Sequence, residues 1–425
     1  MQATINPGSI QGTITAPPSK SAMQRACAAA LTCRREVVLN NPGRSNDDLA
    51  ALDIIRQLGA VVTDDGHTIH IYSRGVQPAA DTIHCGESGL AVRMFTPLAA
   101  LSGKAIQITG SGSLLNRPMD FFDEVLPQLN VSVDSHDGRL PLRIKGPIFP
   151  ADITIDGSLS SQFLTGLMMA YSAASASGVT IHVSDLKSKP YIDLTLQVME
   201  DFGMAVPQNN HYESFFFPPG MPDKTGRLTY TVEGDWSGAA FMMVAGAVAG
   251  SVTVKGVDAF TLQADKAVLQ ALNDTGCRLS IEADQVTVSR TTSLKAFHFN
   301  ATDCPDLFPP LVALAAFCSG TSVIEGVHRL AHKESNRAVS LQEVFSEMGV
   351  DIRFQDDLML VKGTAAVKGA TVSSYNDHRI AMACAVAALR ADGPVTITGA
   401  KAVNKSYPSF FADLQALGVV CNINE

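Results

Sequence analysis

The stretch DLAALDIIRQLGAVV, residues 48–62, decides how this 425-residue chain folds, because five other segments repeat its plan. Apolar residues at helical spacing lead to a Gly or Asn, and a β-branched alternation follows. The other five segments are 119–133 (MDFFDEVLPQLNVSV), 191–206 (YIDLTLQVMEDFGMAV), 264–279 (ADKAVLQALNDTGCRL), 338–352 (AVSLQEVFSEMGVDI) and 407–420 (YPSFFADLQALGVV).

The turn residues of these segments are evenly spaced. They are Gly59, Asn130, Gly203, Gly276, Gly349 and Gly418, with successive differences of 71, 73, 73, 73 and 69. Gly and Asn suit the left-handed backbone that follows the last turn of a helix. The even spacing therefore predicts a sixfold repeat over the whole chain.

A second series of helices, rich in Ala, Met and Leu, alternates with the first. These helices begin near Ser21, Gly89, Ser161, Ser237, Asp306 and Asp377, and short strands such as EVVLNN and TSVIEG follow them. Because they are apolar on all sides, we expect them to be buried, with the amphipathic helices facing solvent. The alternative, six unrelated α/β segments of similar length, leaves the even spacing unexplained.

Six repeats are too many for one core, so we expect two lobes of three repeats each. The polar stretch 224–231 is the expected crossover between the lobes. A second crossover near Pro17 and Pro18 is expected if the first strand pairs with the C-terminal lobe.

Composition limits the classes of function. The chain has 32 Lys and Arg against 41 Asp and Glu, and the net charge of −9 argues against a nucleic acid or an anionic membrane as partner. Eight cysteines are scattered without a CxxC pair, which predicts free thiols in a reducing compartment. The N-terminus has no basic start followed by an apolar run, so we expect a cytoplasmic enzyme. The uncharged stretches 157–184 and 236–254 are interrupted by Gly and Ser, and we expect neither to span a membrane.

Basic and hydroxyl residues gather where loops lead into helices. Such joints include PPSKSAMQR (17–25), SKPYID (188–193), HKESNR (332–337) and NDHR (376–379). Helix N-termini favour anions, so this pattern indicates a small, multiply charged ligand held between the lobes. Each basic residue alone could equally be a solvated surface group.

Two further features have simpler alternatives. Asp306 opens an apolar helix and could be an ordinary N-cap. His328 and His332 have the i, i+4 spacing of metal ligands, but no third ligand stands at a recognisable distance, so we expect no metal site.

Ten motifs together resemble the 5-enolpyruvylshikimate-3-phosphate (EPSP) synthases, or 3-phosphoshikimate 1-carboxyvinyltransferases, a family of enolpyruvyltransferases. The motifs are PPSKSAMQR, GESGLAVR, NRPMD, SLSSQFLTGL, SKPYID, EGDWS, CPD, HKESNR, NDHRIAMA and NKSYPSFF, in the family's order and from about residue 7 to the end. The resemblance implies a two-lobed, inside-out α/β barrel: six βαβαββ-type repeats, three per domain, with buried helices. It also implies domains of 21–228 and of 1–20 plus 229–425.

The resemblance implies a reaction and its substrates. The enolpyruvyl group of phosphoenolpyruvate moves to the 5-hydroxyl of shikimate 3-phosphate and phosphate is released, without a metal or organic cofactor, in chorismate and aromatic amino-acid biosynthesis. The enzyme is expected to be a monomer and a target of glyphosate.

Residue by residue, the resemblance implies three sets of site residues. The shikimate 3-phosphate set is Lys20, Ser21, Arg25, Ser160, Ser161, Gln162, Ser188, Tyr191, Asp306 and Lys333. The phosphoenolpyruvate set is Lys20, Gly89, Arg117, Gln162, Arg337, Arg379 and Lys405. The catalytic set is Asp306 as base for the hydroxyl, Glu334 as proton donor to the methylene carbon, and Lys20 and His378 beside them.

Three positions depart from the commonest family pattern. Glu87 stands where Asn is usual, Leu90 where Thr is usual, and Arg329 where Asn or an acidic residue is frequent. The first two put the geometry of the phosphoenolpyruvate loop in doubt.

Two rival functions remain at this point. The sister enolpyruvyltransferases that act on UDP-N-acetylglucosamine carry a reactive Cys near the equivalent of Arg117, whereas this chain has no Cys between Cys85 and Cys277. A repeat scaffold without catalysis would give the clustered charges no ligand to offset their repulsion.

Overall fold

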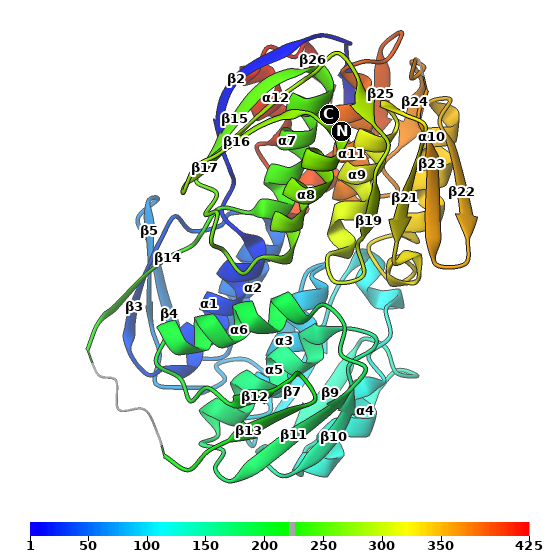
Figure 1. Cartoon of the computed structure of the whole chain (residues 1–425). Helices are drawn as coiled ribbons and strands as arrows, with labels where there is room; N and C mark the ends of the chain where they lie inside the picture. Colours follow the sequence, from blue (N-terminus) through cyan, green and yellow to red (C-terminus); the bar gives the residue numbers. More distant parts are fainter. Residues whose placement is uncertain (221–225, 365, 425) are drawn as a thin grey trace. The chain divides into compact units, whose positions relative to one another are not determined.

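The computed structural model describes residues 1–220, 226–364 and 366–424. It divides into two compact units, an N-terminal unit of residues 18–232 and a C-terminal unit of residues 1–17 and 233–425. The described residues form six four-stranded sheets, three in each unit, and one two-stranded pair. Figure 1 shows the elements of each unit with their labels.

The N-terminal unit contains three repeats of one plan. The first comprises α1 (Lys20–Thr32), β3 (Glu36–Asn40), α2 (Asn46–Gln57), β4 (Val61–Asp64), β5 (Thr68–Tyr72) and β14 (Leu228–Thr231). The second comprises β6 (Thr82–His84), α3 (Gly89–Ala99), β7 (Ala105–Thr109), η1 (Gly112–Asn116), α4 (Phe121–Val125), η2 (Leu126–Leu129), β8 (Ser132–Ser135) and β9 (Leu142–Lys145). The third comprises β10 (Ile153–Asp156), α5 (Ser161–Ala173), β11 (Val179–Ser184), α6 (Lys189–Asp201), β12 (Gln208–Asn210) and β13 (Ser214–Phe217).

The C-terminal unit follows the same plan. Its first repeat comprises β2 (Ile10–Thr15), α7 (Trp236–Ala249), β15 (Gly250–Lys255), η3 (Ala264–Ala267), α8 (Val268–Thr275), β16 (Arg278–Ile281) and β17 (Gln285–Ser289). The second comprises β19 (His298–Asn300), η4 (Pro305–Leu307), α9 (Phe308–Ala315), β21 (Thr321–Glu325), η5 (Val327–Leu330), α10 (Arg337–Glu347), β22 (Asp351–Gln355) and β23 (Leu358–Lys362). The third comprises β24 (Thr371–Ser373), α11 (His378–Ala388), β25 (Val395–Thr398), η6 (Ala400–Lys405), α12 (Phe410–Ala416), β26 (Cys421–Asn424) and β1 (Gln2–Ile5). The two-stranded pair is β18 (Leu294–Lys295) with β20 (Cys318–Ser319).

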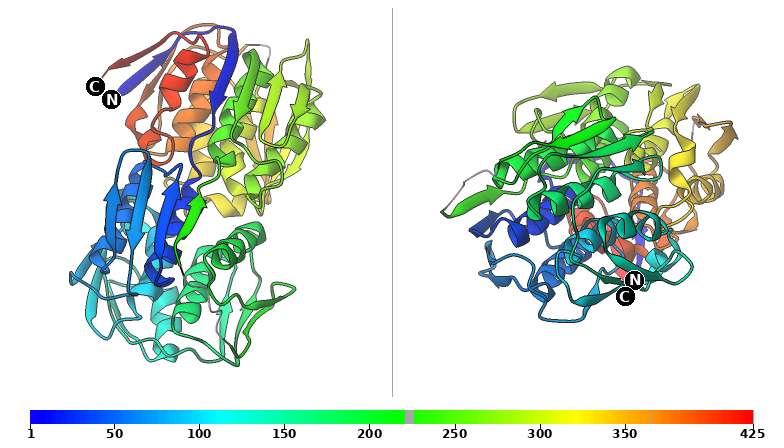
Figure 2. Two further views of the ribbon diagram at one scale, coloured as in Figure 1. Left: turned by 90° about the vertical axis from the view of Figure 1, so that its left-hand side faces the viewer. Right: turned by 90° about the horizontal axis from the view of Figure 1, so that it is seen from below.

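Every four-stranded sheet has the same strand order. A parallel pair is extended by two antiparallel strands, as in β6-β7-β9-β8, and in four of the sheets a buried helix joins the two parallel strands. In the sheets of β3 and β15, the parallel partner, β14 or β2, comes from a distant part of the chain. In the last sheet β1 supplies the fourth strand between β25 and β26, so the two termini lie side by side (Figure 2). The expected βαβαββ repeat is thus present six times.

The apolar helices form the cores. All 14 residues of α7 are buried, and α3, α9 and α11 are buried along their whole lengths. The amphipathic α2 buries Leu52 and Ile55 but exposes Leu49 and Asp53. The predicted inside-out arrangement of buried helices within outer sheets is therefore confirmed.

The six predicted turn residues all adopt positive φ. Gly59, Gly203, Gly276, Gly349 and Gly418 have φ of 69–105°, and Asn130 has φ of 62°. The helical periodicity and the turn chemistry therefore located the ends of all six amphipathic helices correctly.

The chain changes unit twice, between Pro17 and Pro18 and between Val232 and Glu233. The first two strands pair with the C-terminal half, since β1 pairs with β25 and β26 and β2 lies parallel to β15. The first two residues of the expected crossover at 224–231, residues 224 and 225, lie outside the described residues. Leu228–Thr231 instead forms β14, which pairs with β3 and keeps the chain in the N-terminal unit up to Val232.

Two further observations complete the fold. All eight cysteines are free. None of the helices in the described ranges has the length and the apolar character needed to span a membrane.

Candidate active site

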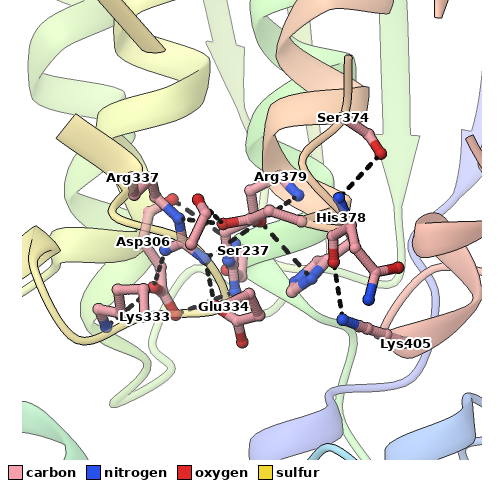
Figure 3. A network of polar contacts seen from close by, with 12 residues as sticks. Ser237, Asp306, Lys333, Glu334, Arg337, Ser374, His378, Arg379 and Lys405 are labelled. Atoms are coloured by element: carbon pink, nitrogen blue, oxygen red, sulfur yellow. Dashed lines mark hydrogen bonds and ion pairs between the residues drawn. The ribbon is translucent and has the colours of Figure 1, made fainter. Parts of the chain in front are cut away.

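Arg337 is the centre of a charged cluster in the C-terminal unit (Figure 3). It is the first residue of α10 and its side chain is fully buried. Its Nη1 lies 2.9 Å from Oδ1 of Asp306, its Nε lies 2.9 Å from Oδ2 of Asp377, and its Nη2 pairs with Glu334. A buried guanidinium needs such partners, and these three carboxylates raise its pKa.

Asp306 is the carboxylate on which the cations of this cluster converge. Its Oδ1 accepts hydrogen bonds from Nζ of Lys333 at 3.2 Å and from Arg337, and its Oδ2 accepts one from Nη2 of Arg379 at 3.0 Å. Burial alone would raise the pKa of Asp306, but the three cations, Arg379 first, hold it well below its usual range. The Asp306 side chain is therefore an ionised carboxylate within a cationic frame, and not the simple N-cap that was the alternative.

Arg379 joins the cluster from the start of α11. Its backbone N–H donates to Oδ1 of Asp377, the N-cap of that helix, at 2.9 Å. Its guanidinium contacts Asp306 and the hydroxyl of Ser237, which lies on α7. The N-terminal ends of α7 and α11 thus lie close to η4, the turn that carries Asp306 and leads into α9.

His378 and Lys405 lie beside this cluster in Figure 3. His378 is the first residue of α11 and is 1% exposed. Lys405 ends η6, is buried, and donates to the carbonyl oxygen of Asn376 at 2.7 Å. The C-terminal unit therefore collects all the site residues that were predicted in it.

The predicted residues of the N-terminal unit begin on α1. Nζ of Lys20, at the start of the helix, lies 2.9 Å from Oδ2 of Asp47. Arg25 is 1% exposed and donates to Thr195, to the carbonyl oxygen of Ser21 and to that of Tyr191. Burial lowers the pKa of Arg25 to about 10, so the group remains a cation at neutral pH.

Gly89 is the first residue of α3 and allows a close approach of arginine. A Cβ at Gly89 would lie 2.6 Å from Nη1 of Arg117, so a larger residue would displace that side chain. Arg93, one turn along α3, donates to Oε1 of Gln162 at 3.0 Å and lies over the ring of Phe163. Arg93 thus contacts the start of α5, and Arg117 lies against the start of α3.

The remaining predicted residues lie at the starts of α5 and α6. Ser160 caps α5 and accepts from the backbone N–H of Gln162, and Ser161 is buried beside it. Ser188 precedes α6 with φ of 57°. The predicted residues therefore fall into two sets, one in each unit, and several residues of each set lie at the N-terminal ends of helices.

Several neighbours of these residues were not predicted. Asp47, Asp377 and Ser237 each contact a predicted cation through a side chain. Asp235 and Asp377 do stand immediately before apolar helices, a signal of an N-cap, but no sequence pattern indicates that Asp377 also binds Arg337.

His328 of the histidine pair contacts an aspartate. His328 is exposed and its Nδ1 lies 2.8 Å from Oδ1 of Asp357. In the part of the chain that the structure describes, no three His, Cys, Asp or Glu side chains gather as metal ligands.

Comparison with known proteins identifies the family. A sequence model of EPSP synthase (3-phosphoshikimate 1-carboxyvinyltransferase) matches residues 5–414. The chain belongs to the EPSP synthase family. It is a transferase that moves the enolpyruvyl group of phosphoenolpyruvate to shikimate 3-phosphate in aromatic biosynthesis.

Relatives match along their whole lengths. A 3-phosphoshikimate 1-carboxyvinyltransferase of Thermococcus kodakarensis is 38% identical, covering 96% of this chain and 98% of its own. One of Clostridium novyi is 33% identical, covering 97% of each chain. The solved EPSP synthase of Acinetobacter baumannii shares the fold over the full length of both chains, with a TM-score of 0.82 at 24% identity.

Proposed function

We propose that the helix N-termini of both units contribute residues to the binding of each substrate of this reaction. Shikimate 3-phosphate and phosphoenolpyruvate each carry a phosphate and a carboxylate, which need several Arg and Lys partners. The shikimate 3-phosphate set is Lys20, Ser21, Arg25, Ser160, Ser161, Gln162, Ser188, Tyr191, Asp306 and Lys333. The phosphoenolpyruvate set is Lys20, Gly89, Arg117, Gln162, Arg337, Arg379 and Lys405.

The placement of Asp306 carries the catalytic part of the proposal. Its carboxylate contacts Arg379, Lys333 and Arg337 and is ionised, so it can accept a proton. Anionic substrates would compete with Asp306 for Arg379 and Lys333. That competition raises the carboxylate pKa toward the range a general base needs for the 5-hydroxyl.

Glu334 is the proposed proton donor to the methylene carbon. In the described structure its carboxylate pairs with Arg337, which favours the ionised form. Glu334 therefore acts as donor only if substrate binding weakens that pair and the carboxyl takes up a proton. Lys20 and His378 complete the proposed catalytic set. His378 is buried at the start of α11, between Asp377 and Arg379 in the sequence.

The proposals on partners, cofactors and location combine charge and composition with the family resemblance. We propose a monomeric cytoplasmic enzyme that binds neither nucleic acid nor membrane and needs no metal or organic cofactor. The net charge of −9 supports the exclusion of polyanionic partners. Sedimentation at micromolar concentration tests the monomer.

Phosphate release tests the proposed function. The purified enzyme should release phosphate from phosphoenolpyruvate only when shikimate 3-phosphate is present, in equal amount to the acceptor consumed. UDP-N-acetylglucosamine in place of shikimate 3-phosphate should give no release. Release without an acceptor, or with the nucleotide sugar alone, would refute the assignment.

A further inference from the structure

Ser237 is the second residue of α7 and contacts the cation that we assign to phosphoenolpyruvate. Its side chain is 6% exposed, and its hydroxyl oxygen accepts a hydrogen bond from Nη1 of Arg379. The backbone N–H of Ser237 donates to Oδ1 of Asp235, the N-cap of α7, at 3.0 Å. The helix is therefore capped by Asp235 and not by the Ser237 hydroxyl, whose hydrogen-bond partner is Arg379.

The two arginines of the cluster differ in what surrounds them. Arg337 contacts three carboxylates, those of Asp306, Glu334 and Asp377. The guanidinium of Arg379 contacts the carboxylate of Asp306 through Nη2 and the neutral hydroxyl of Ser237 through Nη1. The charge of Arg379 is thus less compensated by direct partners than that of Arg337.

We propose that Ser237 is a positioning residue for phosphoenolpyruvate, acting through Arg379; the inference rests on the proposed function. A guanidinium beside a carboxylate favours a bidentate pair, in which two parallel N–H groups face the two oxygens. Because Nη1 donates to the Ser237 hydroxyl and lies 3.5 Å from the backbone carbonyl oxygen of Asp306, Arg379 does not present both of its terminal nitrogens to the Asp306 carboxylate. A hydroxyl does this without adding a negative charge that would repel an anionic substrate.

Ser237→Ala removes the hydroxyl and leaves the cap from Asp235 in place. The Michaelis constant for phosphoenolpyruvate should rise about tenfold, the change expected for one lost hydrogen bond to a charged group. The constant for shikimate 3-phosphate should change less than about threefold, because Arg379 is not among the residues assigned to that substrate. Ser237→Thr keeps the hydroxyl and should restore the wild-type value.

Direct binding provides a second measurement. Trp236 is the one tryptophan of the chain, is fully buried and adjoins Ser237. Its fluorescence should therefore report phosphoenolpyruvate binding in the presence of shikimate 3-phosphate, with a similar loss of affinity in Ser237→Ala. Ser237→Cys, whose thiol is a weaker acceptor, should lie between Ser and Ala even if the Ala variant folds poorly.

Ser322→Ala is the matched control. Ser322 is a fully buried serine on β21 of the same unit, and its hydroxyl accepts from the backbone N–H of Phe297. This variant should lower the melting temperature and leave both Michaelis constants unchanged. If Ser237→Ala raises both Michaelis constants equally, or leaves the constant for phosphoenolpyruvate unchanged, the inference about Ser237 is wrong. A wild-type enzyme without activity would instead refute the proposed reaction.

Discussion

Asp306 and Arg379 contact each other, yet the proposal gives them different roles, which two substitutions can separate. Asp306→Ala removes the proposed base, so kcat should fall about 10²–10⁴-fold with a smaller change in substrate binding. Arg379→Ala removes a cation, so it should chiefly raise the Michaelis constant for phosphoenolpyruvate. Steady-state kinetics with each substrate varied in turn provides both constants.

Asp306→Asn is the control for the first variant. It keeps an oxygen that can accept from Arg337 and Arg379 but cannot take up a proton, so its kcat should be as low as that of the Ala variant. If both Asp306→Ala and Arg379→Ala lose activity only through weaker binding, the assignment of the base is wrong.

Asp48 makes stability depend on pH. Its carboxylate is 1% exposed and accepts from the backbone N–H and the hydroxyl of Ser45 in a capping box. Burial raises the pKa of Asp48 to about 6. The folded state therefore binds this proton more tightly than the unfolded chain, and the stability it contributes is lost as pH rises from about 4 through 6.

Asp48→Asn keeps the acceptor oxygen and removes the titration. The stability of the variant relative to the wild type should increase by about 2 kcal/mol from pH 4.5 to pH 7.5, because the folded wild type loses the Asp48 proton over this range. Urea unfolding at the two pH values measures the gain. Asp53→Asn, at an exposed position of the same helix, should show no such difference; a pH-independent offset in Asp48→Asn would contradict the raised pKa.

At the scale of elements, replacing a turn glycine should lower the free energy of unfolding by different amounts at different turns. Gly276 has φ of 76° and a Cβ there would meet nothing within 4 Å. Gly59 has φ of 105° and a Cβ there would lie 2.3 Å from the carbonyl oxygen of Gln77. Gly276→Ala should cost about 1–2 kcal/mol from backbone strain alone, and Gly59→Ala about 3 kcal/mol or more.

Urea unfolding of both variants measures these costs. Gly276→Asn should be milder than Gly276→Ala, because Asn tolerates the left-handed region, as Asn130 does at the equivalent turn. An equal loss in Gly59→Ala and Gly276→Ala would show that the Gln77 carbonyl moves away without cost.

Glu87 and Leu90, at the start of α3, are expected to lower the affinity for glyphosate. The family resemblance implies that glyphosate binds in the phosphoenolpyruvate site. The Glu87 carboxylate lies over Gly112, in the loop that leads to Arg117, since a Cβ on Gly112 would be 2.3 Å from its Oε2. Leu90 is buried in the first turn of α3. A carboxylate near this loop disfavours an anion, and a partial mimic can lose more affinity than the substrate.

We therefore expect the wild type to be less sensitive to glyphosate than the double variant Glu87→Asn, Leu90→Thr. The measurement is the ratio of the glyphosate inhibition constant to the Michaelis constant for phosphoenolpyruvate. The ratio should fall in the double variant; a constant or higher ratio would refute the role of these two positions.

The helices and turns were predictable because their signals are local. Helical periodicity, the αL preference of Gly and the all-apolar pattern of α7 depend on residues within one element. The strand β14 was missed because its pairing with β3 joins residues about 190 positions apart, and the polar sequence around it reads as a linker. The position of β1 in the last sheet likewise depends on β25 and β26, which lie at the other end of the chain.

The placement of charged residues near helix N-termini was predictable from the sequence, but the pairing of their side chains was not. The sequence places Arg337 and Asp306 in separate motifs, and only the fold shows that Arg337 contacts three carboxylates while Arg379 contacts Ser237. Such contacts depend on side-chain directions that three different helices set, and no spacing along the chain encodes them.

At the scale of the whole molecule, the residues assigned to shikimate 3-phosphate belong to both units, with Lys20 and Arg25 in one and Asp306 and Lys333 in the other. If one small molecule contacts both groups, its binding energy favours an arrangement of the units in which these contacts are made together. The radius of gyration from small-angle scattering should therefore fall when saturating shikimate 3-phosphate is added. Arg25→Ala, which removes a proposed contact from one unit, should require more ligand for the same change. A radius that stays constant at saturation, with binding shown independently, would mean either that ligand-free enzyme already holds the units in the bound arrangement or that one unit binds this substrate alone, and both outcomes contradict ligand-driven closure.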